Sequence, residues 1–242
     1  MEIKICHLYP DVLNLYGDRG NIMTLVNRLK WRGIDVSVDR VPIGESVQLA
    51  RYDLIFIGGG QDFEQELLLG DLHKGKDAQI RSAVEDGAVF LTICGGYQML
   101  GEYYETCEGV KCGFIGAIDL HTIGGRQRMT GNCKFLCESS AGGSTVVGFE
   151  NHSGKTYLGS GIKPLGKVLV GHGNNGSDGT EGVHYKNVFG TYSHGPVLPK
   201  NPAFCDHLLA TALERKYGTG ELAPLDDSTE LAAHDAMCAK LQ

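Results

Sequence analysis

The stretch from Ala88 to Gly101, AVFLTICGGYQMLG, decides the architecture of this 242-residue chain. Its first six residues form a nearly continuous apolar run, typical of a central strand in a parallel sheet that helices cover on both faces. The run ends at Cys94-Gly95-Gly96, and the following residues favour a short helix. The stretch therefore predicts a buried strand that turns sharply into a helix at the carboxyl edge of a sheet.

Upstream of this stretch, short β-branched runs alternate with helical patterns, which indicates parallel βαβ units. In one of these patterns apolar residues recur at i, i+3, i+4 and i+7, as in an amphipathic helix, and Gly33 marks the end of that helix. The expected strands cover residues 3–8, 34–38, 52–57 and 88–93, and the expected helices cover residues 18–32 and 76–86.

From about residue 110 to residue 191, glycine becomes dense and helical periodicity disappears. This texture predicts short strands joined by turns, followed by a return to helix near the end of the chain. We find no internal repeat and no long linker, and therefore expect one domain. The expected strands lie at 144–149, 167–170 and 183–188, a loop at 171–182, helices at 203–217 and 228–241, and a C-terminal helical extension at 206–242.

Composition and charge restrict the classes of function. The formal net charge of −7 and the lack of a basic patch argue against a nucleic-acid surface. The first residues do not resemble a signal peptide, and the longest apolar run is far shorter than the ~20 residues of a membrane helix. We expect a cytoplasmic protein that acts on small molecules.

Eight cysteines in a reducing compartment require an explanation other than disulfides. A zinc site is the weaker alternative, because the loops between its candidate ligands are wider than the usual zinc knuckle. We expect no metal, and interpret seven of the cysteines as small buried or idle thiols. The candidate zinc ligands are Cys107, Cys112, Cys133 and Cys137.

Cys94 has the sequence context of a nucleophile elbow. A sharp strand-to-helix turn raises the thiol above the sheet edge, and the helix N-terminus favours the thiolate. Gly95 and Gly96 leave room for a substrate carbonyl, and the Gly95 N–H is a candidate oxyanion donor. A buried apolar cysteine is the alternative from this residue alone; the glycines and Gln98 favour the nucleophile.

A thiol nucleophile needs a base, and His194 is the first candidate. It follows the apolar Val188 and Phe189 and precedes Pro196, which places it on a loop after a strand. His152 is the second candidate, and the other histidines are interpreted as idle.

Gly58-Gly59-Gly60 follows an expected strand but lacks the Gly-Lys-Ser/Thr ending of a phosphate-binding loop. The Gly60 N–H is a candidate second oxyanion donor, with a flexible strand-end loop as the alternative. Arg128 could pair with a substrate carboxylate. From its own stretch of sequence, a solvated basic turn is the simpler interpretation of Arg128.

Together, three motifs resemble the class I (triad) glutamine amidotransferases, and within them the branch found in cobyric acid synthases. The likeness extends to about Lys200, and further stretches resemble the GatD subunits of lipid II isoglutaminyl synthase in Gram-positive bacteria. The three motifs lie at 58–62, 94–98 and 190–195, and the further stretches at 13–18, 148–152 and 184–187.

This resemblance implies an α/β fold with a flavodoxin-like, mostly parallel sheet flanked by helices, and a glutaminase domain over residues 1–205. Cys94 would attack the side-chain amide of L-glutamine, and His194 would transfer protons. The roles that it implies are catalysis for Cys94 and His194, the oxyanion hole for Gly60 and Gly95, and substrate binding for Arg128 and Gln98.

The resemblance also implies a heterodimer with a Mur-ligase-like (MurT-like) synthetase. That partner would use ATP and Mg to activate the α-carboxyl group of D-glutamate in the lipid II stem peptide and would receive the ammonia. No cofactor is expected in this chain, because it has no phosphate-binding motif. We expect neither nucleic-acid binding nor direct membrane insertion.

One position departs from the class I pattern. Those enzymes usually carry a glutamate two residues after the histidine, and here that residue is Pro196. The site is therefore either a Cys–His dyad or receives a carboxylate from elsewhere. The resemblance favours an aspartate from the partner, and on that hypothesis the isolated chain hydrolyses glutamine weakly.

Three other functions share these residues. An amidotransferase of the cobyric acid type would differ in its acceptor and would carry a P-loop synthetase domain in the same chain. A cysteine hydrolase of the same fold would not depend on glutamine. A catalytically inactive docking subunit would not need Cys94 and His194.

Overall fold

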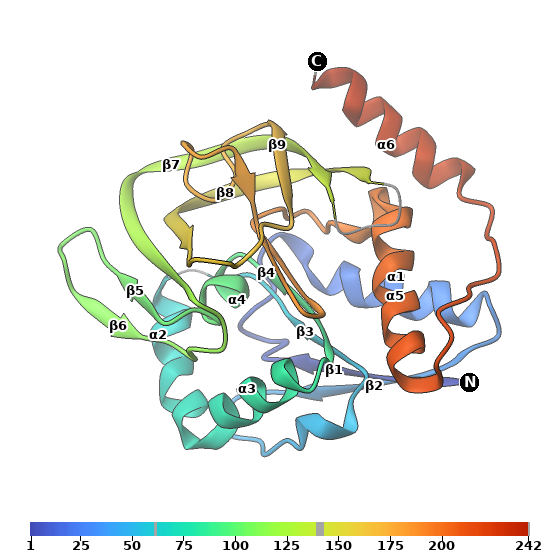
Figure 1. Ribbon diagram of the computed structural model, residues 1–242, viewed down its shortest axis with the longest axis horizontal. Helices are drawn as coiled ribbons and strands as arrows, with labels where there is room; N and C mark the ends of the chain where they lie inside the picture. Colours follow the sequence, from blue (N-terminus) through green and yellow to red (C-terminus); the bar gives the residue numbers. More distant parts are fainter. Residues whose placement is uncertain (61, 139–142, 242) are drawn as a thin grey trace.

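The computed structural model describes residues 1–60, 62–138 and 143–241, and within them it contains two six-stranded sheets. The first sheet has the order β11-β12-β4-β3-β1-β2, of which Figure 1 labels β4, β3, β1 and β2. All its neighbouring strands are parallel except β11, which runs antiparallel to β12 at one edge. The strands are β1 (Glu2–Leu8), β2 (Asp35–Val41), β3 (Leu54–Ile57), β4 (Val89–Ile93), β11 (Val183–Tyr185) and β12 (Val188–Thr191).

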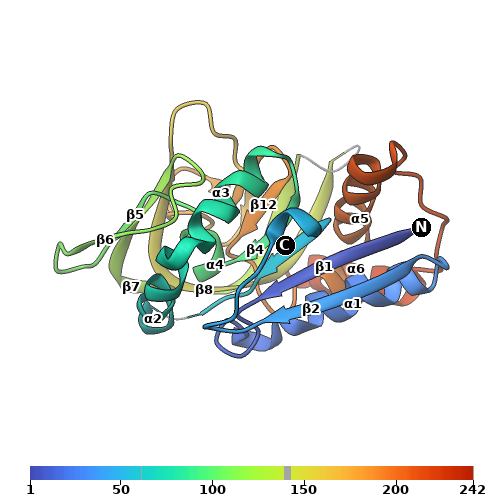
Figure 2. The same cartoon turned by 90° about the horizontal axis from the view of Figure 1, so that it is seen from below.

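Helices cover both faces of this sheet. β1–α1–β2 and β3–α3–β4 step in opposite directions along the sheet, so right-handed crossovers place α1 and α3 on opposite faces. α5 contacts α1 where the two helices cross in the view of Figure 1, and Figure 2 shows α1 and α3 apart, with strands of the sheet between them. Every residue of β3 and β4 is consequently buried, which explains their unbroken apolar sequences. These helices are α1 (Arg19–Lys30), α3 (Asp77–Glu85) and α5 (Pro202–Tyr217).

The glycine-rich middle of the chain forms the second sheet, with the order β10-β9-β7-β5-β6 and with β8 paired to β7. The long antiparallel pair β7–β8 forms most of it and is interrupted by a register shift between Gly124 and Met129. Its strands are β5 (Tyr103–Glu105), β6 (Lys111–Gly113), β7 (Leu120–Cys137), β8 (Ser144–Leu158), β9 (Gly166–Val170) and β10 (Thr180–Glu181).

The remaining elements are short or peripheral. α4 follows β4 directly, and α6 closes the described chain (Figure 1). Among the described residues, no helix has the length and apolar character to cross a membrane. These elements are η1 (Leu15–Gly17), η2 (Leu49–Arg51), α2 (Asp62–Asp71), η3 (Leu72–Lys76), α4 (Gly95–Gln98), η4 (Leu198–Lys200) and α6 (Ser228–Lys240).

The structure confirms the α/β class and the mostly parallel sheet, and it differs from the prediction in several details. The strand expected at 183–188 is the hairpin β11–β12, because Lys186 adopts a positive φ of 50° and reverses the chain. α2 was not predicted, because three of its four apolar residues are consecutive, at 67–69, and give only a weak amphipathic pattern. The boundary expected at 205/206 falls inside α5, whose Phe204, Cys205 and Leu208 are buried in the core.

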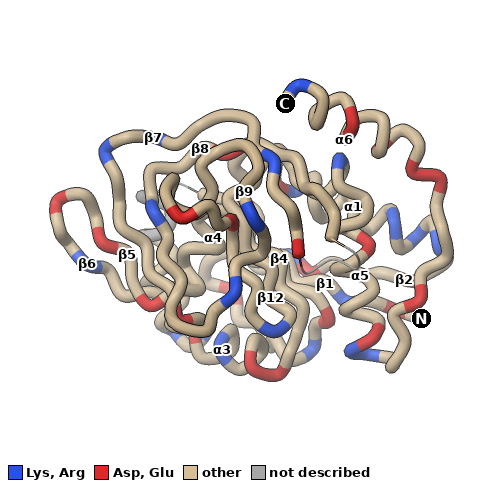
Figure 3. The backbone as a smooth tube through the Cα atoms, turned by 45° about the horizontal axis from the view of Figure 1, so that its top comes forward, with Lys and Arg blue, Asp and Glu red and all other residues tan. Residues whose placement is uncertain are grey.

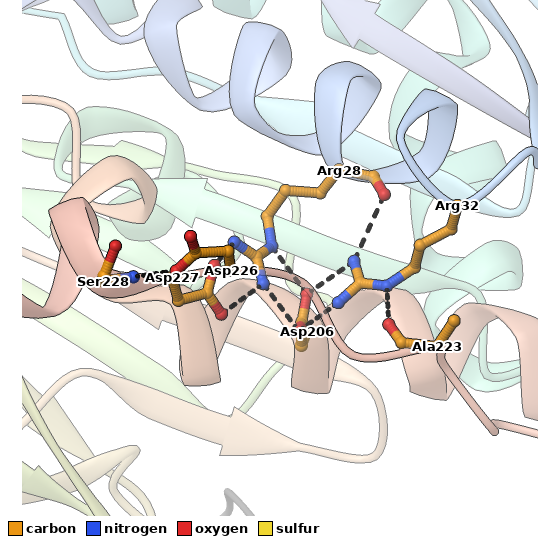
Figure 4. Close-up of polar contacts among 7 residues, drawn as sticks. All are labelled: Arg28, Arg32, Asp206, Ala223, Asp226, Asp227 and Ser228. Atoms are coloured by element: carbon orange, nitrogen blue, oxygen red, sulfur yellow. Dashed lines mark hydrogen bonds and ion pairs between the residues drawn. The ribbon is translucent and has the colours of Figure 1, made fainter.

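The segment between α5 and α6 is anchored by a partly buried cluster of charges (Figure 4). Arg28 of α1 is 1% exposed and donates to both carboxylate oxygens of Asp206 and of Asp227, at 2.5–2.9 Å. Arg32 adds bonds to Asp206 and to the Ala223 carbonyl. The two arginines and two aspartates balance in charge, so the partly buried carboxylates compensate the buried guanidinium groups.

Candidate active site

Four loops meet at the carboxyl edge of the parallel sheet, after β1, β3, β4 and β12. The crossovers from β1 and β3 leave to opposite faces of the sheet, which makes this the point where such sheets open a crevice for ligands. The candidate residues Gly60, Cys94 and His194 follow β3, β4 and β12. The strand order thus gathers motifs that are far apart in the sequence.

Cys94 lies at the turn from β4 into α4, with φ 47° and ψ −107°. Non-glycine residues seldom adopt such angles, and strain of this kind concentrates at functional turns. Its amide donates to the Thr191 carbonyl at 2.8 Å, which joins the elbow to the end of β12. The turn at Cys94 therefore has the geometry predicted for a nucleophile elbow, and the residue is 5% exposed.

Gly96 allows the glycine loop after β3 to pack directly on the elbow. A Cβ atom at Gly96 would lie 2.7 Å from the carbonyl oxygens of both Ile57 and Gly58, far inside ordinary contact distance. The loop that carries Gly60 therefore lies against the turn that carries Gly95, and both glycines are buried. This places the two predicted oxyanion donors on adjacent loops; the neighbouring Gln61 lies outside the described residues.

His194 is fully buried between the two sheets. Its backbone N–H donates to the Phe149 carbonyl at 2.7 Å, and its own carbonyl accepts from Phe149, which ties the loop to β8. The Tyr16 ring lies edge-on over the imidazole, with centroids 5.1 Å apart. His194 Nδ1 lies 3.7 Å from Asp18 Oδ2.

The electrostatics of His194 favour a charged imidazolium. Burial lowers the pKa of His194, but the negative charge on Cys94 and the Asp18 carboxylate outweigh burial and raise the pKa to about 10. The structure thus brings Cys94 and His194 within electrostatic reach of each other.

A family model described as the CobB/CobQ-like glutamine amidotransferase domain matches residues 4–202. The chain belongs to this amidotransferase family. Subunit GatD of lipid II isoglutaminyl synthase (glutamine-hydrolyzing) from Staphylococcus aureus is 44% identical over 98% of this chain and 95% of its own length. The subunit of the same name from Streptococcus pneumoniae is 42% identical over 90% of this chain and 83% of its own length.

A solved structure supports the fold of this amidotransferase. The structure of PurLQS from Thermotoga maritima aligns with 80% of the chain and 88% of its own, with a TM-score of 0.54 and 17% sequence identity. A likeness at that identity bears on the fold alone.

Arg128 and Gln98 occupy different surroundings in the amidotransferase. Arg128 is exposed on β7, and its Nε donates to Asn151 Oδ1 at 2.8 Å; Asn151 in turn donates to the hydroxyl of Tyr16 above His194. The guanidinium is thus connected to the rim of the site. Gln98 is buried under the elbow, where its amide donates to the Tyr192 hydroxyl at 2.9 Å. Substrate binding by either residue stays a prediction.

His152, the second candidate base, is held in a neutral state. It is buried and stacks on Tyr192 with centroids 3.6 Å apart, while Nδ1 contacts the Gly154 carbonyl at 2.8 Å. Burial lowers the pKa of His152 to about 4. A base that stays neutral and packed beneath the site is less suited to proton transfer than His194.

The distribution of charge and cysteine adds two observations. Lys and Arg are interspersed with Asp and Glu along the chain of the amidotransferase (Figure 3). Within residues 1–60, 62–138 and 143–241, no group of three His, Cys, Asp or Glu residues is arranged to hold a metal ion. Of the candidate zinc ligands, Cys133 and Cys137 are buried, while Cys107 is exposed.

Two residues that the structure brings to the site, Tyr16 and Asp18, had no role in the sequence-based prediction. Both lie in the connection between β1 and α1, within the stretch 13–18 that contributed to the family resemblance. Because β1 adjoins β3, loops after both strands reach the same edge of the sheet. The position of this loop directly after the first strand was the sequence signal that could have placed Tyr16 and Asp18 at the site.

Proposed function

We propose that this chain is the glutamine-hydrolysing subunit of a lipid II isoglutaminyl synthase. The observation that carries the proposal is the 44% identity, over nearly the full length of both chains, to a relative of that name. The paired Cys94 and His194 at the carboxyl edge supply a suitable chemistry. Their arrangement alone is compatible with any glutamine amidotransferase.

The first half of the reaction forms a thioester. The Cys94 thiolate attacks the side-chain carbonyl carbon of glutamine, and the carbonyl oxygen becomes an oxyanion that the Gly60 and Gly95 N–H groups stabilise. His194 enters this step already protonated, because its pKa is raised to about 10. It therefore carries the proton that the departing nitrogen needs, and the C–N bond breaks to release ammonia.

The second half regenerates the enzyme. His194, now neutral, accepts a proton from water, and the resulting hydroxide attacks the thioester carbonyl. The C–S bond breaks, glutamate leaves, and Cys94 and His194 return to the thiolate and imidazolium pair. The balance is one glutamine and one water consumed for one glutamate and one ammonia.

The use of this ammonia requires a second subunit. Amidating a carboxylate requires its activation, and the described chain contains no phosphate-binding motif that would supply it. We propose a heterodimer with a Mur-ligase-like, MurT-like synthetase that binds ATP and Mg and amidates the α-carboxyl group of D-glutamate in lipid II. An amidotransferase subunit of another pathway would differ in this partner alone.

Covalent labelling tests the glutaminase. The glutamine analogue 6-diazo-5-oxo-L-norleucine should modify Cys94 of the purified chain, seen as one added mass on that residue. Cys107→Ser, which removes an exposed thiol, should label normally, and Cys94→Ala should not label. Glutamine hydrolysis with no requirement for Cys94 would refute the mechanism.

Reconstitution tests the acceptor. The chain should co-purify with a Mur-ligase-like protein, and the pair should convert lipid II to its isoglutaminyl form only with glutamine, ATP and Mg present. Co-purification with a different ATP-dependent synthetase, without lipid II amidation, would reject the lipid II assignment and leave the glutaminase intact.

A further inference from the structure

Glu181 is a buried carboxylate that the glutaminase mechanism described above does not use. It ends β10 and is 3% exposed, and within the described part of the chain it forms no ion pair with a lysine or arginine. Burial raises the pKa of Glu181 to about 7, although its hydrogen bonds oppose the shift. A buried carboxylate without a cation costs stability unless hydrogen bonds compensate it, so its hydrogen-bond donors indicate what it does.

Both of these donors belong to the segment that leads to His194. Glu181 Oε1 accepts the Thr191 hydroxyl at 2.6 Å and the Tyr192 N–H at 2.8 Å. The Thr191 hydroxyl oxygen in turn accepts the Ser193 N–H at 2.9 Å. One carboxylate oxygen therefore fixes three consecutive residues, directly or through one hydroxyl, and the next residue is His194.

The second sheet holds the same segment from its other side. The Tyr192 ring stacks on His152, and the Tyr192 hydroxyl lies 2.6 Å from Thr156 Oγ1. The backbone of His194 exchanges two hydrogen bonds with Phe149. These three contacts come from β8, so the segment 191–194 is fixed between β8 and the Glu181 carboxylate of β10.

The connection from β10 to β11 also touches the elbow side of the site. Asn174 is buried, and its Oδ1 accepts both the Gly182 N–H at 2.8 Å and the hydroxyl of Tyr97, in α4, at 3.0 Å. A Cβ atom at Gly182 would lie 2.1 Å from the Gly190 carbonyl oxygen, so this connection passes directly against β12. It therefore contacts both the helix that follows the nucleophile and the strand that precedes the base.

We propose that Glu181 is a positioning residue of the glutaminase site, which fixes the His194 loop relative to the nucleophile elbow through its bonds to Thr191 and Tyr192. This inference rests on the proposed glutaminase function. Glu181 acts on the loop that carries the base, not on the imidazole, so the aspartate supplied by the partner stays a separate prediction. A displacement near 1 Å can cost about 100-fold in rate, which is why the loop must be held.

Glu181→Ala and Glu181→Gln test this role in the complex. Alanine removes the acceptor, so kcat for glutamine hydrolysis should fall at least about tenfold with KM changed less than about twofold. Glutamine should keep kcat within about threefold of wild type, because both donors share one oxygen that an amide also provides. A loss in Glu181→Gln as large as in Glu181→Ala would assign the effect to the charge and overturn the inference.

Asp53→Ala is the matched control for loss of a buried carboxylate. Asp53 is 7% exposed and accepts the Lys4 N–H at 2.7 Å, but it precedes β3 at the opposite, amino edge of the sheet. Its removal should lower the temperature of unfolding and leave kcat at the wild-type value when all variants are assayed while folded. Equal losses of kcat in Asp53→Ala and Glu181→Ala would reduce the effect to stability and overturn the inference.

Hydrogen exchange provides a readout that does not depend on turnover. The Tyr192 and Ser193 amides are held by Glu181 and by Thr191, so a peptide spanning residues 190–196 should exchange faster in Glu181→Ala and at the wild-type rate in Asp53→Ala. Unchanged exchange of this peptide in Glu181→Ala would contradict the inference. Absence of glutaminase in the wild-type complex would instead refute the proposed function, whatever the exchange shows.

If Glu181→Ala does not fold, Thr191 decides the matter. Thr191→Val keeps the shape of the side chain and removes the hydroxyl that links Glu181 to the Ser193 N–H. We expect kcat to fall about fivefold in Thr191→Val and to stay within about twofold of wild type in Thr191→Ser, which keeps the hydroxyl. Wild-type kcat in Thr191→Val would overturn the inference.

Discussion

Replacing Gly96 with alanine should disable the site through geometry alone. The added Cβ would meet two backbone carbonyl oxygens at 2.7 Å, where ordinary contacts begin at 3.4 Å. The elbow and the glycine loop must therefore separate by about 0.7 Å, because neither oxygen is at the end of a flexible side chain. Displacements near 1 Å can cost about 100-fold in rate, so we expect kcat to fall about 10- to 100-fold.

Glutamate release and thermal unfolding should be measured on the same preparations. Overpacking of this kind costs about 1–3 kcal/mol, so Gly96→Ala should remain folded at assay temperature. Gly113→Ala is the control, since a Cβ there meets no atom within 4 Å. Wild-type kcat in Gly96→Ala would show that the elbow and the glycine loop do not need this close approach, and would refute the assignment of the oxyanion hole to Gly60 and Gly95.

Three further predictions concern stability and substrate binding. Arg28→Ala should lower the free energy of unfolding, measured by urea titration, by about 3 kcal/mol, because two partly buried carboxylates lose their partner. The control Arg40→Ala, at an exposed ion pair, should lower it by less than about 1 kcal/mol. Similar losses in the two variants would contradict the prediction. The pKa of His152 is about 4 in the folded chain, against an ordinary 6.5, so the unfolded chain binds the proton first as pH falls. The free energy of unfolding should therefore decrease between about pH 6.5 and pH 4, by up to ~1.4 kcal/mol per pH unit. His152→Gln should make that decrease shallower, and an unchanged slope would disprove the prediction. Arg128→Ala should raise the KM for glutamine at least about tenfold with a smaller effect on kcat, while Arg126→Ala should leave KM unchanged; equal effects of the two changes would remove Arg128 from the substrate site.

The sequence predicted most elements of the parallel sheet because each carries its own signal. β4 was recognisable from an apolar run that only a strand covered on both faces needs, and α1 from its periodic apolar residues and terminal glycine. The hairpin at 183–191 was missed because its reversal depends on one lysine with positive φ, which local composition does not reveal. The helix α2 was missed because its apolar pattern is weak.

The sequence by itself determined the class of chemistry. A cysteine between a core strand and two glycines, with a histidine in a distant loop, specifies which atoms react, since each of these motifs can be recognised from a short stretch of sequence. Only the tertiary structure decided which other side chains lie next to the cysteine and the histidine. Asp18 reaches His194 because β1 lies beside β3 and because α1 packs on Pro196, and contacts between residues 176 positions apart have no counterpart in local sequence. A buried charge acquires its role from what surrounds it, and the fold alone supplies those surroundings.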